Sequence, residues 1–341
     1  AYDLWGNSLA YQGNYRDAVA QEEIALRLAR KTGLRCEEAR ALSSLAYSSD
    51  SIPAGKDHLV AALFIYREMG DKPGECTCLE ALGYAFLWVG DFDHSLDCYE
   101  ESLQLSRQIG FRGGEVTALF RLGHFYNQVG NYQQGKNYLE PALSMARSDH
   151  DQRRVAYGLF NLSVSENGMG KATLAKKYAS EALSICQKIG DHNGEINAWV
   201  ILGDAFKALQ QWEDATAAFQ QAFDLNPRTA DPSGAIYCQA KLAGALLRQG
   251  KETQAVAYIE DIMAYEEQGG DMQGTDEGPI PLYVDCYRIL QATGDPRAQK
   301  MLQTAHSLLL KQVSQIKNER IRQSFLKNRP ENRELMEAWE R

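Results

Sequence analysis

The side chains that most often carry catalysis are scattered through this sequence of 341 residues. It contains no HExxH metal motif, no GxxxxGKS/T phosphate loop and no recognisable nucleophile–base–acid set. Cys76 and Cys78 lie two residues apart in a helical pattern, so their thiols point to different faces. The six histidines are far apart, at positions 58, 94, 124, 150, 192 and 306. We therefore expect neither catalysis nor a bound metal or cofactor.

Composition and charge favour a globular protein that binds no nucleic acid. Apolar residues make up 44% of the chain and charged residues 24%, which is typical of a folded domain. The net charge of -9 argues against a phosphate backbone as partner. Because there is no signal-peptide pattern and no run of 18 apolar residues, we expect a cytoplasmic protein without a membrane partner. Seven cysteines, an odd number, are expected to be thiols of the core.

A 40-residue repeat accounts for most of the sequence. One set of residues is followed by its counterparts 40 positions later: Leu82-Gly83, Phe86, Gly90, Phe92, Ser95, Tyr99 and Ser102, then Leu122-Gly123, Tyr126, Gly130, Tyr132, Gly135, Leu139 and Ala142. The same spacing is found at Leu202-Gly203, Phe206, Trp212, Ala215, Phe219 and Ala222. This order resembles the tetratricopeptide repeat, a helix–turn–helix unit. The resemblance implies an all-α, right-handed superhelical solenoid of about eight repeats.

Apolar residues within each repeat have the spacing of amphipathic helices, as in Leu79, Leu82, Ala85 and Phe86. We predict first helices near 73–89, 113–129, 153–169, 193–209 and 281–293, and second helices near 92–109, 132–148, 171–189, 212–225 and 297–318. A further first helix is expected at 2–11. Glycine at 83, 123 and 203 disfavours a helix, and we expect the paired helix to approach closely there.

Three segments depart from this pattern. Repeat five has Ser163 in place of glycine and Glu166 in place of the aromatic residue. The turn of repeat two is three residues short, near 48–55. The Gly-rich and acidic stretch 266–279 is interpreted as a long connection within the array. Because residue 1 is not Met, we expect the chain to be a fragment of a longer protein.

We divide the chain into a repeat solenoid, residues 1–320, and a C-terminal helical cap, residues 321–341. The cap is predicted to be two short helices hinged at Asn328-Arg329-Pro330. A solenoid needs a terminal element that closes its last apolar surface. We expect the apolar side chains of the cap to cover repeat eight while its charges face water. These side chains are Phe325, Leu326, Leu335 and Trp339.

The family resemblance also implies where a ligand binds. With Gly83 numbered as position 8, positions 2, 5, 9, 12 and 13 of the first helices line a concave groove. Aromatic rings supply contact area at low entropic cost, and amides fix orientation. An alternative is that some rings pack only against one another. The series begins with Asn7 and Tyr11, and its strongest candidates are Tyr47, Tyr84, Trp88, Phe120, His124, Asn127, Phe160, Asn167, Asn197, Asp204, Lys207, Arg248, Tyr287 and Arg288.

Charged groups in this series narrow the ligand class. The carboxylate clamp of co-chaperones has Lys at position 5, whereas this chain has Glu80, Phe120, Phe160 and Val200 there, which disfavours that function. Lys207, Arg248 and Arg288 could form a basic strip for an acidic or phosphate-bearing ligand. Alternatively, Asp204 pairs with Lys207, one helical turn away.

Two further motifs resemble one family in particular. The repeats end in turns of the form Gly70-Asp71-Lys72-Pro73-Gly74-Glu75. After the repeats comes the ending I-R-Q-S-F-L-K-N-R-P-E-N-R-E-L, residues 321–335. Both features resemble the tetratricopeptide sensor domains of bacterial STAND-class signalling NTPases, which have a maltose-regulon-activator-like architecture.

This second resemblance implies a non-catalytic sensor arm. Such an arm recognises a peptide, protein or small-molecule inducer in its groove and relieves the autoinhibition of an upstream NTPase module. No Walker motif lies in these residues, so the resemblance places ATP chemistry in upstream sequence. The alternative is a constitutive peptide- or protein-binding scaffold that does not switch.

Overall fold

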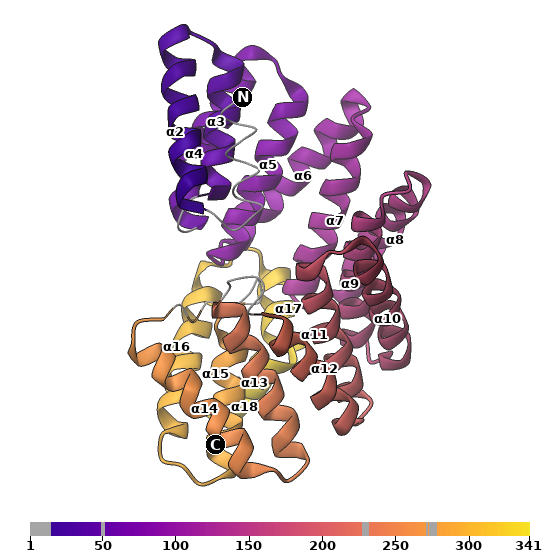
Figure 1. The fold of residues 1–341 in the computed structure, drawn as a ribbon, viewed down its shortest axis with the longest axis vertical. Helices are drawn as coiled ribbons and strands as arrows, with labels where there is room; N and C mark the ends of the chain where they lie inside the picture. The colour runs from indigo at the N-terminus through magenta and orange to yellow at the C-terminus, as the bar shows by residue number, and fades with distance from the viewer. Residues whose placement is uncertain (1–14, 49–51, 227–231, 271, 273–277) are drawn as a thin grey trace. The chain divides into compact units, whose positions relative to one another are not determined.

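All regular structure in the described part of the chain is helical (Figure 1). The computed structural model describes residues 15–48, 52–226, 232–270, 272 and 278–341. The predicted helix at 2–11, with Asn7 and Tyr11, lies outside these residues. The described helices of the first four repeats are α2 (Tyr15–Thr32), α3 (Arg35–Ser48), α4 (Ile52–Met69), α5 (Lys72–Trp88), α6 (Phe92–Ile109), α7 (Arg112–Gln128) and α8 (Tyr132–Ser148).

The later repeats continue the same alternation of helices. Their helices are α9 (Gln152–Gly168), α10 (Ala172–Ile189), α11 (His192–Ala208), α12 (Trp212–Leu225), α13 (Pro232–Arg248), α14 (Glu252–Glu267), α15 (Ile280–Ala292) and α16 (Ala298–Gln315). Two short helices follow, α17 (Glu319–Asn328) and α18 (Pro330–Trp339). The predicted all-α array of sequential helix pairs is confirmed.

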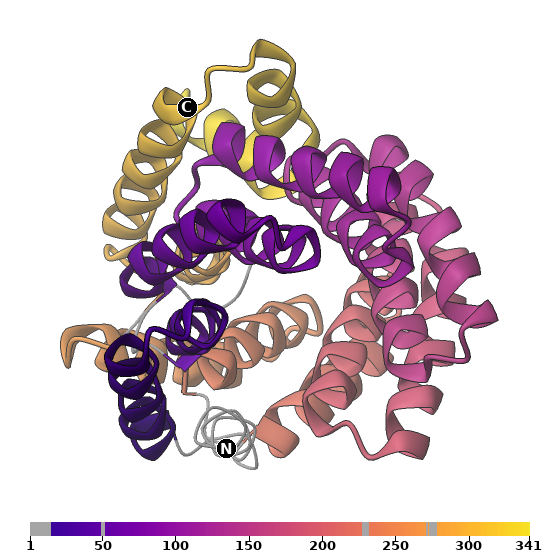
Figure 2. The same cartoon turned by 90° about the horizontal axis from the view of Figure 1, so that it is seen from above.

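The helices form two compact units, residues 1–122, called unit 1, and residues 123–341, called unit 2. The division falls within α7. Inside each unit, helices that are consecutive in the chain pack side by side (Figure 2). In unit 1, α3 packs against α4 and α5 against α6, while in unit 2, α9 packs against α10 and α11 against α12. The division between solenoid and cap at residue 320 stays a prediction.

The Gly-Asp dipeptides between repeats end one helix and begin the next. Gly70 and Gly190 adopt the left-handed conformation, each with a φ of 69°, which satisfies the last carbonyl groups of α4 and α10. Asp71 and Asp191 then accept a hydrogen bond from the backbone N–H of the third residue of the next helix. These residues set the sharp turns of the array.

Glycine at position 8 brings paired helices into contact, as the sequence predicts. A Cβ built on Gly83 would lie 2.5 Å from Cε1 of Tyr99 on the paired helix, and one built on Gly203 would lie 2.4 Å from Cε1 of Phe219. In repeat five the residue that corresponds to Tyr99 and Phe219 is an alanine, which leaves room for a side chain at position 8. The Oγ of Ser163 therefore fits and donates a hydrogen bond to the carbonyl of Ala175 at 2.8 Å.

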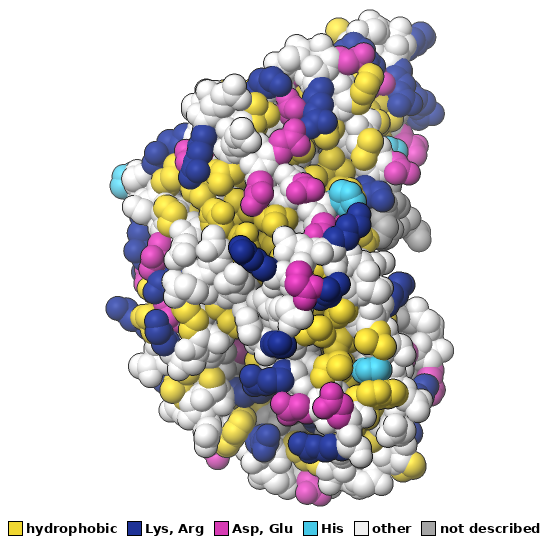
Figure 3. Space-filling model, turned by 180° about the vertical axis from the view of Figure 1, so that it is seen from behind, with side chains coloured by type: hydrophobic (Ala, Val, Ile, Leu, Met, Phe, Trp, Pro, Cys, Tyr) yellow, Lys and Arg dark blue, Asp and Glu magenta, His cyan; other side chains and the backbone are white. Residues whose placement is uncertain are grey.

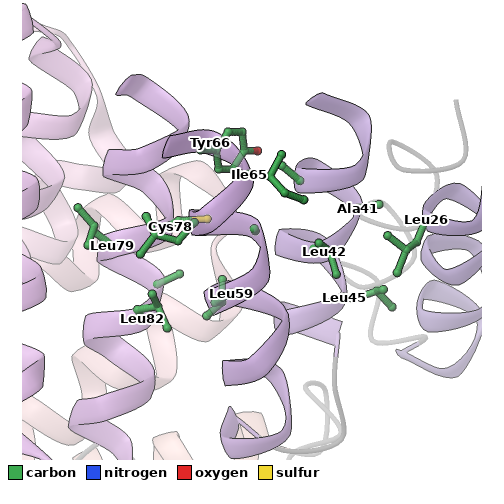
Figure 4. Close-up of a cluster of buried hydrophobic side chains, with 14 residues drawn as sticks. Leu26, Ala41, Leu42, Leu45, Leu59, Ile65, Tyr66, Cys78, Leu79 and Leu82 are labelled. Carbon is green, nitrogen blue, oxygen red and sulfur yellow. The ribbon is translucent and has the colours of Figure 1, made fainter. Parts of the chain in front are cut away.

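The core of unit 1 is built from the inward positions of α2 to α5 (Figure 4). Leu42, Leu59 and Leu79 are almost fully buried, and Cys78 lies among them. All seven cysteines are free, and five of them are buried, as expected for core thiols. Burial raises the pKa of the Cys78 thiol to about 11, so it stays protonated near neutral pH.

Acidic and basic side chains are interspersed over the face in Figure 3. Ion pairs link neighbouring repeats within each unit. Arg67 bonds to Glu101, and Arg147 bonds to Glu181, at 2.6 and 2.8 Å. In each pair the two residues are 34 positions apart and lie on the second helices of consecutive repeats. None of the described helices combines the length and apolar character that crossing a membrane requires.

Candidate ligand-binding faces of the first helices

Side chains on consecutive first helices contact one another in a recurring pattern. Position 9 of one repeat meets position 6 of the next, 37 residues later. The pairs are Tyr84 with the guanidinium of Arg121, His124 with Asn161, and Asp204 with Lys241. The partners at position 6 were not among the predicted site residues. A search for complementary residues 37 apart could have found them.

In unit 1 the predicted rings of Tyr47, near the end of α3, and of Tyr84 and Trp88, in the last part of α5, are at least partly exposed. Tyr47 is 60% exposed. The half-buried rings of Tyr84 and Trp88 lie 6.2 Å apart and are tilted by 50°. The guanidinium carbon of Arg121 lies 5.0 Å from the centre of the Tyr84 ring. We call Tyr47, Tyr84, Trp88 and Arg121 the aromatic face.

Phe120 and Phe160 were also predicted to line the groove, but both rings are buried. Phe120 is 3% exposed and Phe160 is 9% exposed. The alternative that some rings serve only in packing therefore describes these two better. Tyr287 on α15 is buried in the same way.

The predicted amides of α7 and α9 form a buried hydrogen-bond network. The amide of Asn127 donates to the carbonyl of Asn161 at 2.8 Å and accepts from the Oγ of Ser165 at 2.7 Å. The Nδ1 of His124 lies 3.1 Å from the Oδ1 of Asn161, whose own amide donates to the carbonyl of Tyr157. These groups join α7 to α9, so they are engaged within the protein.

Two more predicted amides differ in exposure. Asn197, early in α11, is exposed. Asn167, near the end of α9, is half-buried, and its buried Oδ1 receives no hydrogen bond from the part of the chain that the structure describes.

The expected pairing of Asp204 with Lys207 is wrong. Asp204 instead accepts two hydrogen bonds from the Nζ of Lys241 on the next first helix, at 3.0 and 3.1 Å. Lys241 is buried, and its ammonium also lies 5.1 Å from the centre of the Tyr237 ring. The inter-helix partner is favoured because the buried ammonium needs a counter-charge.

Arg248 and Arg288, the other members of the predicted basic strip, are also engaged. The guanidinium of Arg248 lies over the ring of Trp212, at 5.8 Å from its centre. Arg288 bonds to Asp285 at 2.5 Å and makes two bonds of 2.6 Å to the carboxylate of Glu334. The carboxylate that meets this cation therefore comes from the chain's own C-terminal helix, α18.

The C-terminal helices close part of the last repeat, but they also reach a distant turn. Leu335 is buried, α18 contacts α15 and α16, and the ring of Trp339 stacks on His306 at 3.9 Å. At the other end, Asn328 donates to the carbonyl of Gly130, and Arg329 donates to the carbonyl of Gln128. The expectation that the charges of this segment face water is wrong for Arg329, which is buried.

Charges from three elements act on the first turn of α18. Burial opposes ionisation of the Glu331 carboxyl group, but the positive charges of Arg329, Lys241 and Lys207 outweigh it and hold its pKa below the usual range. Arg288 is also held in its charged form, since the carboxylates of Glu334 and Asp285 outweigh its burial and raise its pKa. The basic residues of this face are therefore matched to acidic residues of α18.

The described residues suit recognition better than catalysis. Among them, no cluster of three or more His, Cys, Asp or Glu side chains could hold a metal ion. Unit 1 offers exposed rings, and unit 2 offers cations that are matched to carboxylates.

Sequence comparison defines the class of the repeats. Residues 153–228 and residues 116–149 match profiles of the tetratricopeptide repeat. These residues are tetratricopeptide repeats, and the chain has the solenoid fold of sequential helix pairs; repeats of this class generally serve as scaffolds for binding peptides and proteins and are typically non-catalytic. No curated protein matches the chain in sequence.

Three solved structures share the fold at low sequence identity. A Rap protein complexed with Competence and Sporulation Factor is 14% identical, with a TM-score of 0.64, over 100% of this chain and 98% of that chain. The APC/C hetero-tetramer Cut9-Hcn1 is 16% identical, with a TM-score of 0.62, over 81% and 48%. A STAND protein with a tetratricopeptide repeat sensor from Pyrococcus horikoshii is 15% identical, with a TM-score of 0.54, over 91% and 51%.

Proposed function

We propose that the chain is a non-catalytic recognition arm that binds an extended peptide or protein segment on the aromatic face of unit 1. The observation that carries this proposal is the exposure of Tyr47 at 60% on α3, together with the half-buried, neighbouring rings of Tyr84 and Trp88 on α5. An exposed ring of this size loses no packing when a partner covers it, and it supplies contact area at low entropic cost.

The chemistry of the aromatic face suits a peptide. The rings of Tyr84 and Trp88 present apolar edges and faces to an apolar side chain, while the guanidinium of Arg121 beside Tyr84 can donate hydrogen bonds to peptide carbonyl groups. Two supports come from outside the molecule. The repeat class generally binds peptides and proteins, and the Rap structure of similar fold is a complex with Competence and Sporulation Factor.

A finer proposal is that this arm senses an inducer for an upstream STAND NTPase. Its supports are the ending at residues 321–335 and the similarity in fold to the STAND sensor from Pyrococcus horikoshii. In this mechanism the empty arm docks on the NTPase module, and the bound inducer favours a conformation that cannot dock. The inducer switches the module only by the difference between its affinities for the two states.

The constitutive scaffold remains the second candidate, and one measurement separates the two. In a full-length protein that carries the NTPase module, the sensor function predicts that ATP turnover and oligomeric state change on ligand binding. The scaffold function predicts that both stay constant while the ligand is bound.

The binding face itself is tested with a peptide selected from a random library against the wild-type chain. Tyr47→Ala and Trp88→Ala should each weaken binding by about tenfold, as expected when a contact worth about 1.4 kcal/mol is lost. Phe64→Ala is the matched control, because Phe64 is 61% exposed in the same unit but lies on the second helix α4. Equal affinities for all three variants and the wild type would exclude the aromatic face as the site.

A further inference from the structure

The first turn of α18 presents two glutamates to basic residues of unit 2. Glu331 and Glu334 are three residues apart, so they lie on the same side of the helix. Glu334 forms a bidentate pair with Arg288 of α15. The charges of Lys207 on α11 and Lys241 on α13 act on Glu331. Three first helices thus supply the cations, and one short helix supplies the carboxylates.

The residues just before α18 fix this helix in register. Asn328 donates to the carbonyl of Gly130 at 3.2 Å, and its approach is close, since a Cβ on Gly130 would lie 3.0 Å from that of Asn328. Asn332 is buried and donates to the carbonyl of Phe325, which holds α17 and α18 at a fixed angle. The segment N-R-P-E-N-R-E, residues 328–334, is therefore seated as a peptide ligand is seated, by side-chain and backbone contacts with several helices.

We propose that Arg288 anchors a binding site for an acidic helical segment that carries two glutamates three residues apart, and that residues 328–334 are its built-in occupant. A partner with the same Pro-Glu-x-x-Glu pattern binds this site by displacing α18. The site is separate from the aromatic face of unit 1, so this inference stands independently of the proposed peptide site.

Three properties make the occupant displaceable. Each of α17 and α18 has only ten residues, too few for a stable isolated helix, so both depend on their contacts with unit 2. The Glu334 side chain is 42% exposed, and salt weakens its pair with Arg288. Arg288 keeps Asp285 as a second partner, which limits the cost of an uncovered cation.

The first test reverses the two charges in the whole chain. The double variant Glu331→Lys with Glu334→Lys should speed hydrogen–deuterium exchange of residues 319–339 by about tenfold or more, a free-energy change of about 1.4 kcal/mol. The matched control is Glu337→Lys with Glu340→Lys, which has the same charge change and the same spacing. Glu337 lies in α18 and Glu340 directly follows it, and both residues are exposed. The control should exchange like the wild type.

The second test supplies the occupant as a separate molecule. A labelled synthetic peptide of residues 317–341 should bind the charge-reversed chain, and the same peptide with both glutamates replaced by lysine should not. In the wild type, excess unlabelled peptide should accelerate exchange of residues 319–339. Equal exchange in the charge-reversed chain and its control would overturn the proposal. So would release of the segment without any binding of the peptide.

A milder pair of variants distinguishes local release of the segment from global unfolding of the chain. Glu331→Gln with Glu334→Gln removes both charges without reversing them, and Glu337→Gln with Glu340→Gln is its control. In the first pair, residues 319–339 should exchange faster than in the wild type, but by less than in the lysine variant. The second pair should exchange like the wild type. Failure of the aromatic-face variants to alter binding of the library peptide would leave these expectations unchanged.

Discussion

The same repeat position serves different purposes in the two units. At position 9, unit 1 carries Tyr47 and Tyr84, whose rings lie on or near the surface. Unit 2 carries His124 and Asp204 there, and both bond to the next first helix. A position within the repeat therefore predicts the direction of a side chain. Whether that side chain is available to a ligand depends on a partner in another repeat.

A second repeat position, in the interior, holds an aromatic ring in some repeats and a charge in another. A lysine of one second helix lies over an aromatic ring 30 residues later, as Lys56 over Phe86 in unit 1 and Lys176 over Phe206 in unit 2. Repeat five has Glu166 where the ring belongs, and the lysine there, Lys136, bonds to its carboxylate at 2.7 Å. Glu166 is fully buried, so unit 2 holds a charge where other repeats hold a ring.

Removing this buried carboxylate should have the largest effect on stability. Glu166→Ala leaves the ammonium of Lys136 with only the exposed, more distant carboxylate of Glu140 and should lower the free energy of unfolding by about 3 kcal/mol. Glu166→Phe should cost less, because it restores the cation–π arrangement of the other repeats. Urea unfolding measures both.

Glu140→Ala is the control for this prediction. Glu140 also lies near Lys136, but its side chain is 56% exposed, and its loss should change the free energy of unfolding by less than about 1 kcal/mol. If Glu140→Ala proved as damaging as Glu166→Ala, burial could not explain the difference between the two carboxylates.

The repeat spacing predicted the elements that local sequence determines. The predicted second helices at 92–109 and 132–148 match α6 and α8 in their limits, because Gly90-Asp91 and Gly130-Asn131 mark where the two helices start. The predicted first helix at 73–89 lies one residue later than α5. The close contact at Gly83 followed from the cost of glycine in a helix, and the structure confirms it.

Long-range partners could not be predicted in the same way. The sequence offered Lys207, one helical turn away, as a partner for Asp204, whereas the structure pairs Asp204 with Lys241 on α13, 37 residues later. The contact of Asn328 with Gly130 spans 198 residues, and no local pattern encodes it. In unit 2 such distant partners occupy several of the predicted site residues, which the spacing of the repeat could not indicate.

High pH should weaken the core of unit 1 through Cys78. The pKa of this thiol is about 11 in the folded chain and about 8.5 when unfolded, so above pH 8.5 the unfolded chain binds fewer protons. The stabilising contribution is complete below pH 8.5 and is lost as the pH rises toward 11. Between pH 8.5 and about 10.5, the wild type should lose about 2–3 kcal/mol more than Cys78→Ala. Parallel slopes for the two proteins would show that Cys78 does not titrate in this way.

A methyl group at position 8 should test the close helix pairing. Gly83→Ala forces the Tyr99 ring to move and should cost about 1–3 kcal/mol, although alanine is the better helix former. Gly244→Ala in α13 is the control, since its added Cβ meets no atom within 4 Å, and it should leave stability equal or raise it by up to about 1 kcal/mol. Equal thermal unfolding temperatures for the two variants would contradict close packing at Gly83.

The smallest change in stability is expected at the exposed position 9 of unit 1. Tyr47→Ala should alter the free energy of unfolding by less than about 0.5 kcal/mol, because the ring is 60% exposed, yet it should weaken binding of the library peptide. Asp204→Ala, at the same position in unit 2, removes the partner of the buried Lys241 and should cost about 1.5–3 kcal/mol while leaving that binding unchanged. Measuring stability and peptide affinity for both variants separates a recognition role from a packing role at one repeat position. If Tyr47→Ala destabilised the fold as much as Asp204→Ala, the ring would be part of the structural framework, and the contrast between the two units would not hold.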